Sequence, residues 1–179
     1  MKDIQVITGC MFAGKTTELI NRLKLINKNY LLVKPKLDTR DIESQICTHD
    51  GLFETAIQVN NLSEIFHKLN DIEVLGVDEA QFFNESIIKE IEYISSKGIS
   101  VIIAGLAKDY LNKSFGCMDK ILQISTSIKW LKAECNRCKK PATFSHRKPN
   151  NRKNQVLIGN SNLIRQFKLR FLTNDSHVL

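Results

Sequence analysis

The chain has 179 residues with a formal net charge of +7, and 42% of the residues are hydrophobic. This length allows one good hydrophobic core with a small appended unit, and the composition is ordinary for a globular protein. No apolar run reaches the roughly 18 residues of a membrane span, and the start Met-Lys-Asp is not that of a signal peptide, so we expect a cytoplasmic protein. The five scattered cysteines exclude a secreted disulfide framework.

The first predicted unit is a strand, a loop and a helix. Residues 4–8 form a short apolar run, and residues 16–27 carry apolar side chains at helical spacing. The segment between them matches the phosphate-loop pattern G-x-x-x-x-G-K-[ST] at every fixed position; it consists of Gly9, Cys10, Met11, Phe12, Ala13, Gly14, Lys15 and Thr16. Loop N–H groups and the positive end of a helix dipole bind phosphate oxygens. We expect Lys15 to reach the β- and γ-phosphates and the Thr16 hydroxyl to bind Mg²⁺, the alternative being a turn shaped by two glycines.

The next elements surround a polar segment. Residues 29–35 predict a second strand, which a proline ends. Residues 36–51 are polar and indicate an active-site loop, in which Arg40 is a candidate clamp for a transferred phosphoryl group or else a surface arginine. Residues 61–69 predict a short amphipathic helix.

An acidic pair follows the next predicted strand, residues 74–77. Asp78 has the position from which phosphate-loop folds complete the Mg²⁺ site. We expect Glu79 to point elsewhere, because side chains alternate along a strand, and to accept a proton from an attacking hydroxyl or water. The alternative is a solvated acidic turn.

The remaining pattern alternates helix and strand. Asn84 is expected to cap a helix that Gly98 ends, residues 100–106 predict a strand, and residues 121–124 and 128–133 are candidates for the last strands. This alternation predicts an α/β fold, a P-loop NTPase-like parallel sheet flanked by helices. The composition becomes polar and basic from Cys135, so we predict one domain over 1–133 and a small second one over 134–179.

Aromatic residues follow the acidic pair and the fourth predicted strand. They are Phe82, Phe83, Tyr110 and Phe115. They are candidates to stack on a planar base, although Phe is more often a core residue. The cysteines have ligand-like spacing only at Cys135 and Cys138.

Short segments in a fixed order carry a family resemblance. In chain order they begin at Gly9 (GCMFAGKTTEL), Asp38 (DTR), Cys47 (CTHD), Asp78 (DEAQFF), Gly105 (GLAKDY), Ser114 (SFG), Cys135 (CNRC), Ala142 (ATFS) and Val156 (VLIG). The set resembles the thymidine kinase family of the cellular, poxviral and bacterial type, from residue 4 to about residue 164.

The resemblance implies roles for individual residues. The general base is Glu79. The segments that hold ATP and Mg²⁺ are Gly9 to Thr16, then Asp38, Thr39 and Arg40, then Asp78, Glu79, Ala80 and Gln81. The thymidine site comprises Met11, Phe82, Leu106, Tyr110, Phe115 and Ser145, together with a loop that covers the base, the lasso, at Gln155, Val156, Leu157, Ile158 and Gly159. A tyrosine that follows the lasso in the family is Ile164 here. A homotetramer is also implied.

The resemblance stops at the zinc site and the C-terminal tail. The family holds its lasso with zinc bound by two pairs of ligands, in a small zinc-ribbon domain. Here Cys135 and Cys138 supply the first pair, while Lys168 and Phe171 occupy the second. Two cysteines do not close a tetrahedral site, and His146 and His177 are the other candidate ligands, so the residues leave zinc binding open. If the incomplete ligand set loosens the lasso, we expect thymidine binding to be affected. ATP binding should be spared, because it depends on the phosphate loop, which we expect to lie far from the lasso.

Two functions of different classes follow. One is an ATP-dependent thymidine kinase, which makes thymidine monophosphate and interacts with neither a membrane nor nucleic acid. The other is a nucleic-acid-associated ATP-binding module, indicated by the basic charge, the phosphate loop and the cysteine pair. The chain lacks a second cysteine pair and a recognisable nucleic-acid-binding motif, which favours the kinase.

Overall fold

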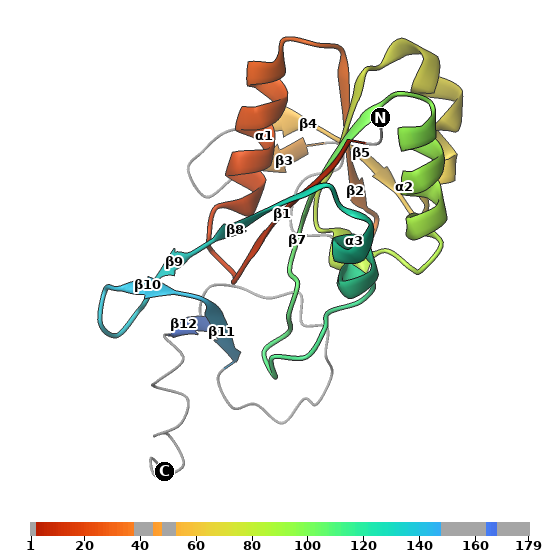
Figure 1. Cartoon of the computed structure of the whole chain (residues 1–179). Coiled ribbons are helices and arrows are strands. Elements are labelled where there is room, and N and C mark those ends of the chain that lie inside the picture. Colours follow the sequence, from red (N-terminus) through yellow and green to blue (C-terminus); the bar gives the residue numbers. More distant parts are fainter. Residues whose placement is uncertain (1–2, 38–44, 48–52, 148–163, 168–179) are drawn as a thin grey trace.

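A computed structural model describes residues 3–37, 45–47, 53–147 and 164–167, and Figure 1 shows its arrangement. Six parallel strands form one sheet in the order β5-β2-β6-β7-β1-β8. In sheet order these strands are Ile57–Val59, Tyr30–Pro35, Val74–Val77, Ser100–Gly105, Ile4–Gly9 and Ser127–Leu131. The predicted α/β fold with a parallel sheet is confirmed.

Helices cover both faces of this sheet (Figure 1). They are α1 (Lys15–Ile26), α2 (Ile87–Ser96), α3 (Met118–Ile124) and the 3₁₀ helices η1 (Leu62–Asp71) and η2 (Ala80–Phe82). Strand β7 shows why two cores form: Val101 and Ile103 pack with α2 and α3, while Ile102 and Ala104 pack with α1. Successive strand side chains point to opposite faces, so this apolar run supplies both cores.

The helix after the phosphate loop approaches the sheet closely. Leu19 and Leu23 are buried on the sheet side of α1. A Cβ added at Gly76 would lie 2.7 Å from Leu23 Cδ1. Because glycine has no side chain, position 76 allows strand β6, which precedes the acidic pair, to approach helix α1 closely.

Three local expectations were wrong. Residues 121–124 belong to helix α3 rather than to a strand, because Met118 and Ile121 are buried three residues apart on one helical face. Helix α2 begins at Ile87, and Asn84 Oδ1 instead accepts the N–H of Ser86 in the preceding turn. The segment expected to be a loop contains β3 (Gln45–Cys47), which pairs antiparallel with β4 (Phe53–Thr55).

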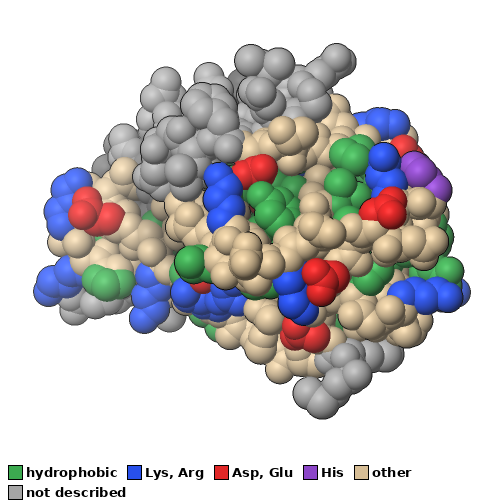
Figure 2. Space-filling model, turned by 90° about the horizontal axis from the view of Figure 1, so that it is seen from above, with side chains coloured by type: hydrophobic (Ala, Val, Ile, Leu, Met, Phe, Trp, Pro, Cys, Tyr) green, Lys and Arg blue, Asp and Glu red, His purple; other side chains and the backbone are tan. Residues whose placement is uncertain are grey.

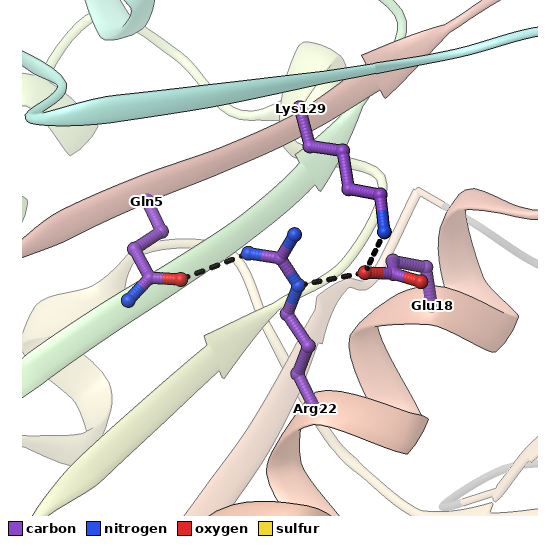
Figure 3. Close-up of polar contacts among 4 residues, drawn as sticks. All are labelled: Gln5, Glu18, Arg22 and Lys129. Atoms are coloured by element: carbon purple, nitrogen blue, oxygen red, sulfur yellow. Dashed lines mark hydrogen bonds and ion pairs between the residues drawn. The ribbon is translucent and has the colours of Figure 1, made fainter.

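A polar network ties the outer strand β8 to α1 (Figure 3). Glu18 Oε1 accepts hydrogen bonds from Lys129 Nζ at 2.7 Å and from Arg22 Nε at 2.8 Å. Arg22 Nη1 also donates to Gln5 Oε1 on β1 at 2.9 Å. One carboxylate thus joins the helix that follows the phosphate loop to the edge of the sheet.

Short strands follow β8 along the chain. They are β9 (Ala133–Glu134), β10 (Pro141–Ala142), β11 (Phe144–Arg147) and β12 (Ile164–Phe167). They pair antiparallel, β9 with β10 and β11 with β12, beyond the end of the sheet where β1 stops (Figure 1).

Two features relate to the membrane and nucleic-acid alternatives considered from the sequence. Among the described residues, no helix has the length and apolar character to cross a membrane. On the face in Figure 2, Lys and Arg side chains lie interspersed with Asp and Glu.

Candidate active site

The phosphate loop connects β1 to α1 and depends on two glycines. Gly9 has φ +150°, and a Cβ there would lie 2.4 Å from the carbonyl oxygen of Leu131. Gly14 has φ +77° with no atom within 4 Å of an added Cβ, so its requirement is conformational alone. The loop therefore needs space at its first glycine and a left-handed backbone at its second.

Two loop side chains are already held in place. Lys15, 9% exposed, donates from Nζ to the carbonyl oxygen of Cys10 at 2.8 Å. Thr16 Oγ1 donates to Asp78 Oδ2 at 3.0 Å, and the N–H of Asp78 donates to the carbonyl oxygen of Val33 at 2.9 Å. The strand-end acid and the loop hydroxyl, 62 residues apart, form one pair of hard oxygen donors. Such donors fit Mg²⁺.

Glu79 lies outside the strand, contrary to the alternation argument. Strand β6 ends at Val77, and Glu79 has φ 50° and ψ 42°, the left-handed region that non-glycine residues seldom occupy. The turn, rather than strand alternation, therefore sets its direction. Backbone strain of this kind is found at functional sites and is consistent with a constrained carboxylate.

The amide of Gln81 holds that carboxylate. Gln81 is 3% exposed; its Nε2 donates a hydrogen bond to Glu79 Oε2, and its Oε1 accepts the N–H of Leu106 at 2.9 Å. Gly105 leaves room for it, since a Cβ there would lie 3.0 Å from Gln81 Oε1. The sequence interpretation placed Gln81 among the ATP-binding residues and missed this bridge.

Two further buried polar residues were missed. Thr8 Oγ1 donates to the carbonyl oxygen of Gly105 and accepts the N–H of Ala107, joining the ends of β1 and β7. Asp109 Oδ1 accepts the N–H groups of Leu111 and Lys113 and shapes the loop that carries Tyr110. The only sequence signal for Asp109 was its place in the segment GLAKDY.

Several predicted thymidine-site residues lie near one another. Phe82 and Phe115 meet edge to face with centroids 5.7 Å apart. Leu106 is buried beside the Gln81 amide, and Tyr110 is half-buried. Phe83, in contrast, packs in the hydrophobic core rather than beside a ligand site.

The phosphate loop also contacts the segment after β8. The N–H of Met11 donates to Ser145 Oγ at 2.8 Å, and Cys10 Sγ donates to the carbonyl oxygen of Ala142 at 3.4 Å. Burial raises the pKa of the Cys10 thiol, so Cys10 is a packed neutral side chain. The expectation that the phosphate loop is distant from this segment was wrong at these contacts.

Other predicted residues lie outside the described part. These are Asp38, Thr39 and Arg40, the lasso residues Gln155, Val156, Leu157, Ile158 and Gly159, and the tail residues Lys168, Phe171 and His177. For Ile164 and His146 only the backbone is described, in β12 and β11.

The cysteine pair does not by itself make a zinc site. Cys135 is fully buried and packs with Cys138 and Ala142. Within the described residues no group of three or more Cys, His, Asp or Glu side chains could hold a metal ion. Two cysteine ligands fall short of the four ligands of a structural zinc, so the described residues alone do not complete a site for that ion.

Comparison with known proteins identifies the family. The thymidine kinase family model matches residues 2–166. The chain is 40% identical to a thymidine kinase of Mycoplasma mobile over 162 residues, which cover 88% of this chain and 80% of that protein. It is 38% identical to a thymidine kinase of Mesoplasma florum, with 75% and 71% covered, and 38% identical to one of Bacteroides thetaiotaomicron, with 87% and 79% covered. The chain therefore belongs to the thymidine kinase family.

Proposed function

We propose that this protein is an ATP-dependent kinase that transfers the γ-phosphoryl group of ATP to the 5′-hydroxyl of thymidine. One observation carries the proposal: the family match over residues 2–166 includes a phosphate loop whose Thr16 hydroxyl lies 3.0 Å from Asp78 Oδ2, next to Glu79. Family membership indicates the substrate. The contacts among these residues suit transfer from a nucleoside triphosphate.

The phosphate loop is the proposed ATP site. Its backbone N–H groups, at the start of α1, would surround the phosphates. Lys15 has three N–H donors, so it would keep one on the Cys10 carbonyl and direct the others to phosphate oxygens. Thr16 and Asp78 would hold Mg²⁺, which neutralises charge on the phosphates. Arg40, with Asp38 and Thr39, is the proposed clamp on the transferred group.

Glu79 is the proposed general base. Its carboxylate would take the proton of the thymidine 5′-hydroxyl while that oxygen forms a bond to the γ-phosphorus. The bond from the γ-phosphorus to the bridging oxygen breaks, and ADP leaves with that electron pair. The hydrogen bond from Gln81 would hold the Glu79 carboxylate in a fixed orientation during this step.

The thymidine site is proposed near the contact between the phosphate loop and β11. Met11 and Leu106 would contact the thymine methyl group, with Tyr110, Phe115 and Ser145 beside it and the lasso over the base. One methyl group in an apolar pocket contributes about 1–3 kcal/mol, so deoxyuridine is expected to be a poorer substrate. Deoxycytidine would leave lasso backbone groups unpaired and be rejected more strongly.

Further proposals rest on family resemblance and on composition. The division into 1–133 and 134–179 and the cytoplasmic location remain predictions. A homotetramer is consistent with the outer edge of the sheet, where Ile128 and Trp130 of β8 are 43% and 57% exposed. Sedimentation of the purified protein tests this assembly.

Purified protein with Mg²⁺ and ATP tests the function directly. ADP release is measured after separate additions of thymidine, deoxycytidine and single-stranded DNA. We expect turnover with thymidine and formation of thymidine monophosphate, with little from the other two. Turnover stimulated by DNA alone would reject the kinase in favour of a nucleic-acid-associated module.

A further inference from the structure

We propose that Ser145 is a positioning residue for the phosphate loop, and that it orients Lys15 through the peptide that joins Cys10 to Met11. Nucleotide binding then depends on strand β11 as well as on the loop itself. The nucleotide-binding part of this inference needs no thymidine, and only its effect on turnover rests on the proposed function.

The loop is anchored at two consecutive residues. Met11 donates its N–H to Ser145 Oγ at 2.8 Å, across 134 positions of sequence. Cys10, 5% exposed, donates Sγ–H to the carbonyl oxygen of Ala142 at 3.4 Å. Both acceptors belong to β10 and β11, so this segment holds both sides of one peptide unit in the loop.

That peptide transmits the orientation to Lys15. The N–H and C=O of a trans peptide lie in one plane and point in opposite directions. Here the N–H belongs to Met11 and is held by Ser145, while the C=O belongs to Cys10 and accepts Lys15 Nζ at 2.8 Å. Rotating this peptide would break both hydrogen bonds, so the Ser145 hydroxyl fixes the carbonyl that holds the lysine.

Position 145 is itself placed by a strand. Ser145 pairs with Gln166 in the β11–β12 ladder, and it is half-buried. A threonine also supplies a hydroxyl at this position, whereas a valine has the shape of threonine without the hydroxyl. Comparing Thr with Val therefore removes the hydrogen bond while the space filled next to Met11 stays the same.

The loss of one neutral hydrogen bond to a backbone N–H determines how large a change in nucleotide affinity we expect. Without it the loop must be ordered when nucleotide binds, so affinity falls. We expect S145V to bind MgATP and MgADP about three- to tenfold more weakly than S145T. The control is T143V, the same hydroxyl-to-methyl change on an exposed residue two positions away, and its nucleotide affinity should equal that of the wild type.

Titration calorimetry with MgADP in the absence of thymidine measures these affinities. Steady-state kinetics then separate the KM for ATP, expected to rise in S145V relative to S145T, from the KM for thymidine. Equal MgADP affinity of S145T and S145V would overturn the proposal. A difference confined to the thymidine KM would also overturn it, and would assign the hydroxyl to the base.

Two controls keep the outcome interpretable. Thermal unfolding shows whether each variant is folded, and if S145V is not, S145A replaces it in the comparison with S145T. If the wild type does not phosphorylate thymidine, the proposed function fails, while the MgADP titrations still decide the role of Ser145.

Discussion

The side-chain amide of Gln81 donates to the carboxylate of Glu79, and the same amide accepts the N–H of Leu106. Because the two ends of the amide have opposite hydrogen-bonding character, turning it over would lose both bonds. Gln81 thus links the direction of the proposed base to Leu106, the residue that follows strand β7 and a proposed thymine contact. The role of Gln81 can therefore be tested separately from that of Glu79.

Glu79→Gln should lower kcat by about 10²- to 10⁴-fold, the usual size of a general-base contribution. The substitution removes the proton acceptor but retains the shape and a carbonyl oxygen for the Gln81 amide. Calorimetric affinities for ATP and thymidine should change little. The control is Glu85→Gln, an exposed carboxylate on the same segment, and wild-type kcat in Glu79→Gln would exclude Glu79 as the base.

Gln81→Met should lower kcat by about 10- to 100-fold, since misorientation of a reacting group by about 1 Å costs this much. Methionine has a similar length without either hydrogen bond. Gln81→Glu keeps an acceptor for the Leu106 N–H but places a second carboxylate beside Glu79, so it too should lower kcat. Kinetics with both variants check this, and a change in the KM for ATP with kcat intact would contradict the positioning role.

Gly116→Ala should destabilise the protein more than Gly98→Ala. Both glycines have positive φ, +56° and +83°, and alanine costs about 1–2 kcal/mol there. At Gly116 the added Cβ would also lie 2.2 Å from the carbonyl oxygen of Gln81, whereas at Gly98 no atom lies within 4 Å. Overpacking adds about 1–3 kcal/mol and should also lower kcat by moving Gln81. Urea unfolding measures both free energies, and equal losses would show that the backbone relaxes without cost.

The Glu18 network predicts a stability contribution that depends on pH. Burial raises the pKa of Glu18, but hydrogen bonds from Lys129 and Arg22 outweigh burial and hold this pKa below its usual value of 4.5. A lowered folded-state pKa contributes stability above the unfolded pKa, and this contribution is lost as the pH falls through the folded pKa.

Glu18→Gln should therefore lower the free energy of unfolding by less than about 1 kcal/mol at pH 7. The difference from the wild type should shrink as the pH falls below about 4.5. Urea unfolding between pH 3 and pH 7 measures the difference, and the same series at high salt should show a smaller one. A difference that grows at low pH would contradict the assigned ion pairs.

Local pattern in the sequence was enough to predict the phosphate loop, the parallel sheet and most of its strands. These features depend on glycine positions and on apolar periodicity, which act over a few residues. The order of motifs was also enough to identify the family. The sequence prediction was wrong at residues 121–124, because a short apolar run fits strand and helix equally well and only packing of Met118 and Ile121 decides.

Only the tertiary structure decided how the site is held together. Thr8 with Ala107, Gln81 with Leu106 and Met11 with Ser145 are 99, 25 and 134 positions apart. A polar side chain gives no local signal of which distant backbone group it will meet, because the partner depends on where the sheet brings the two segments. Strand alternation was the wrong reason for the direction of Glu79, because this residue lies in a left-handed turn beyond the end of the strand.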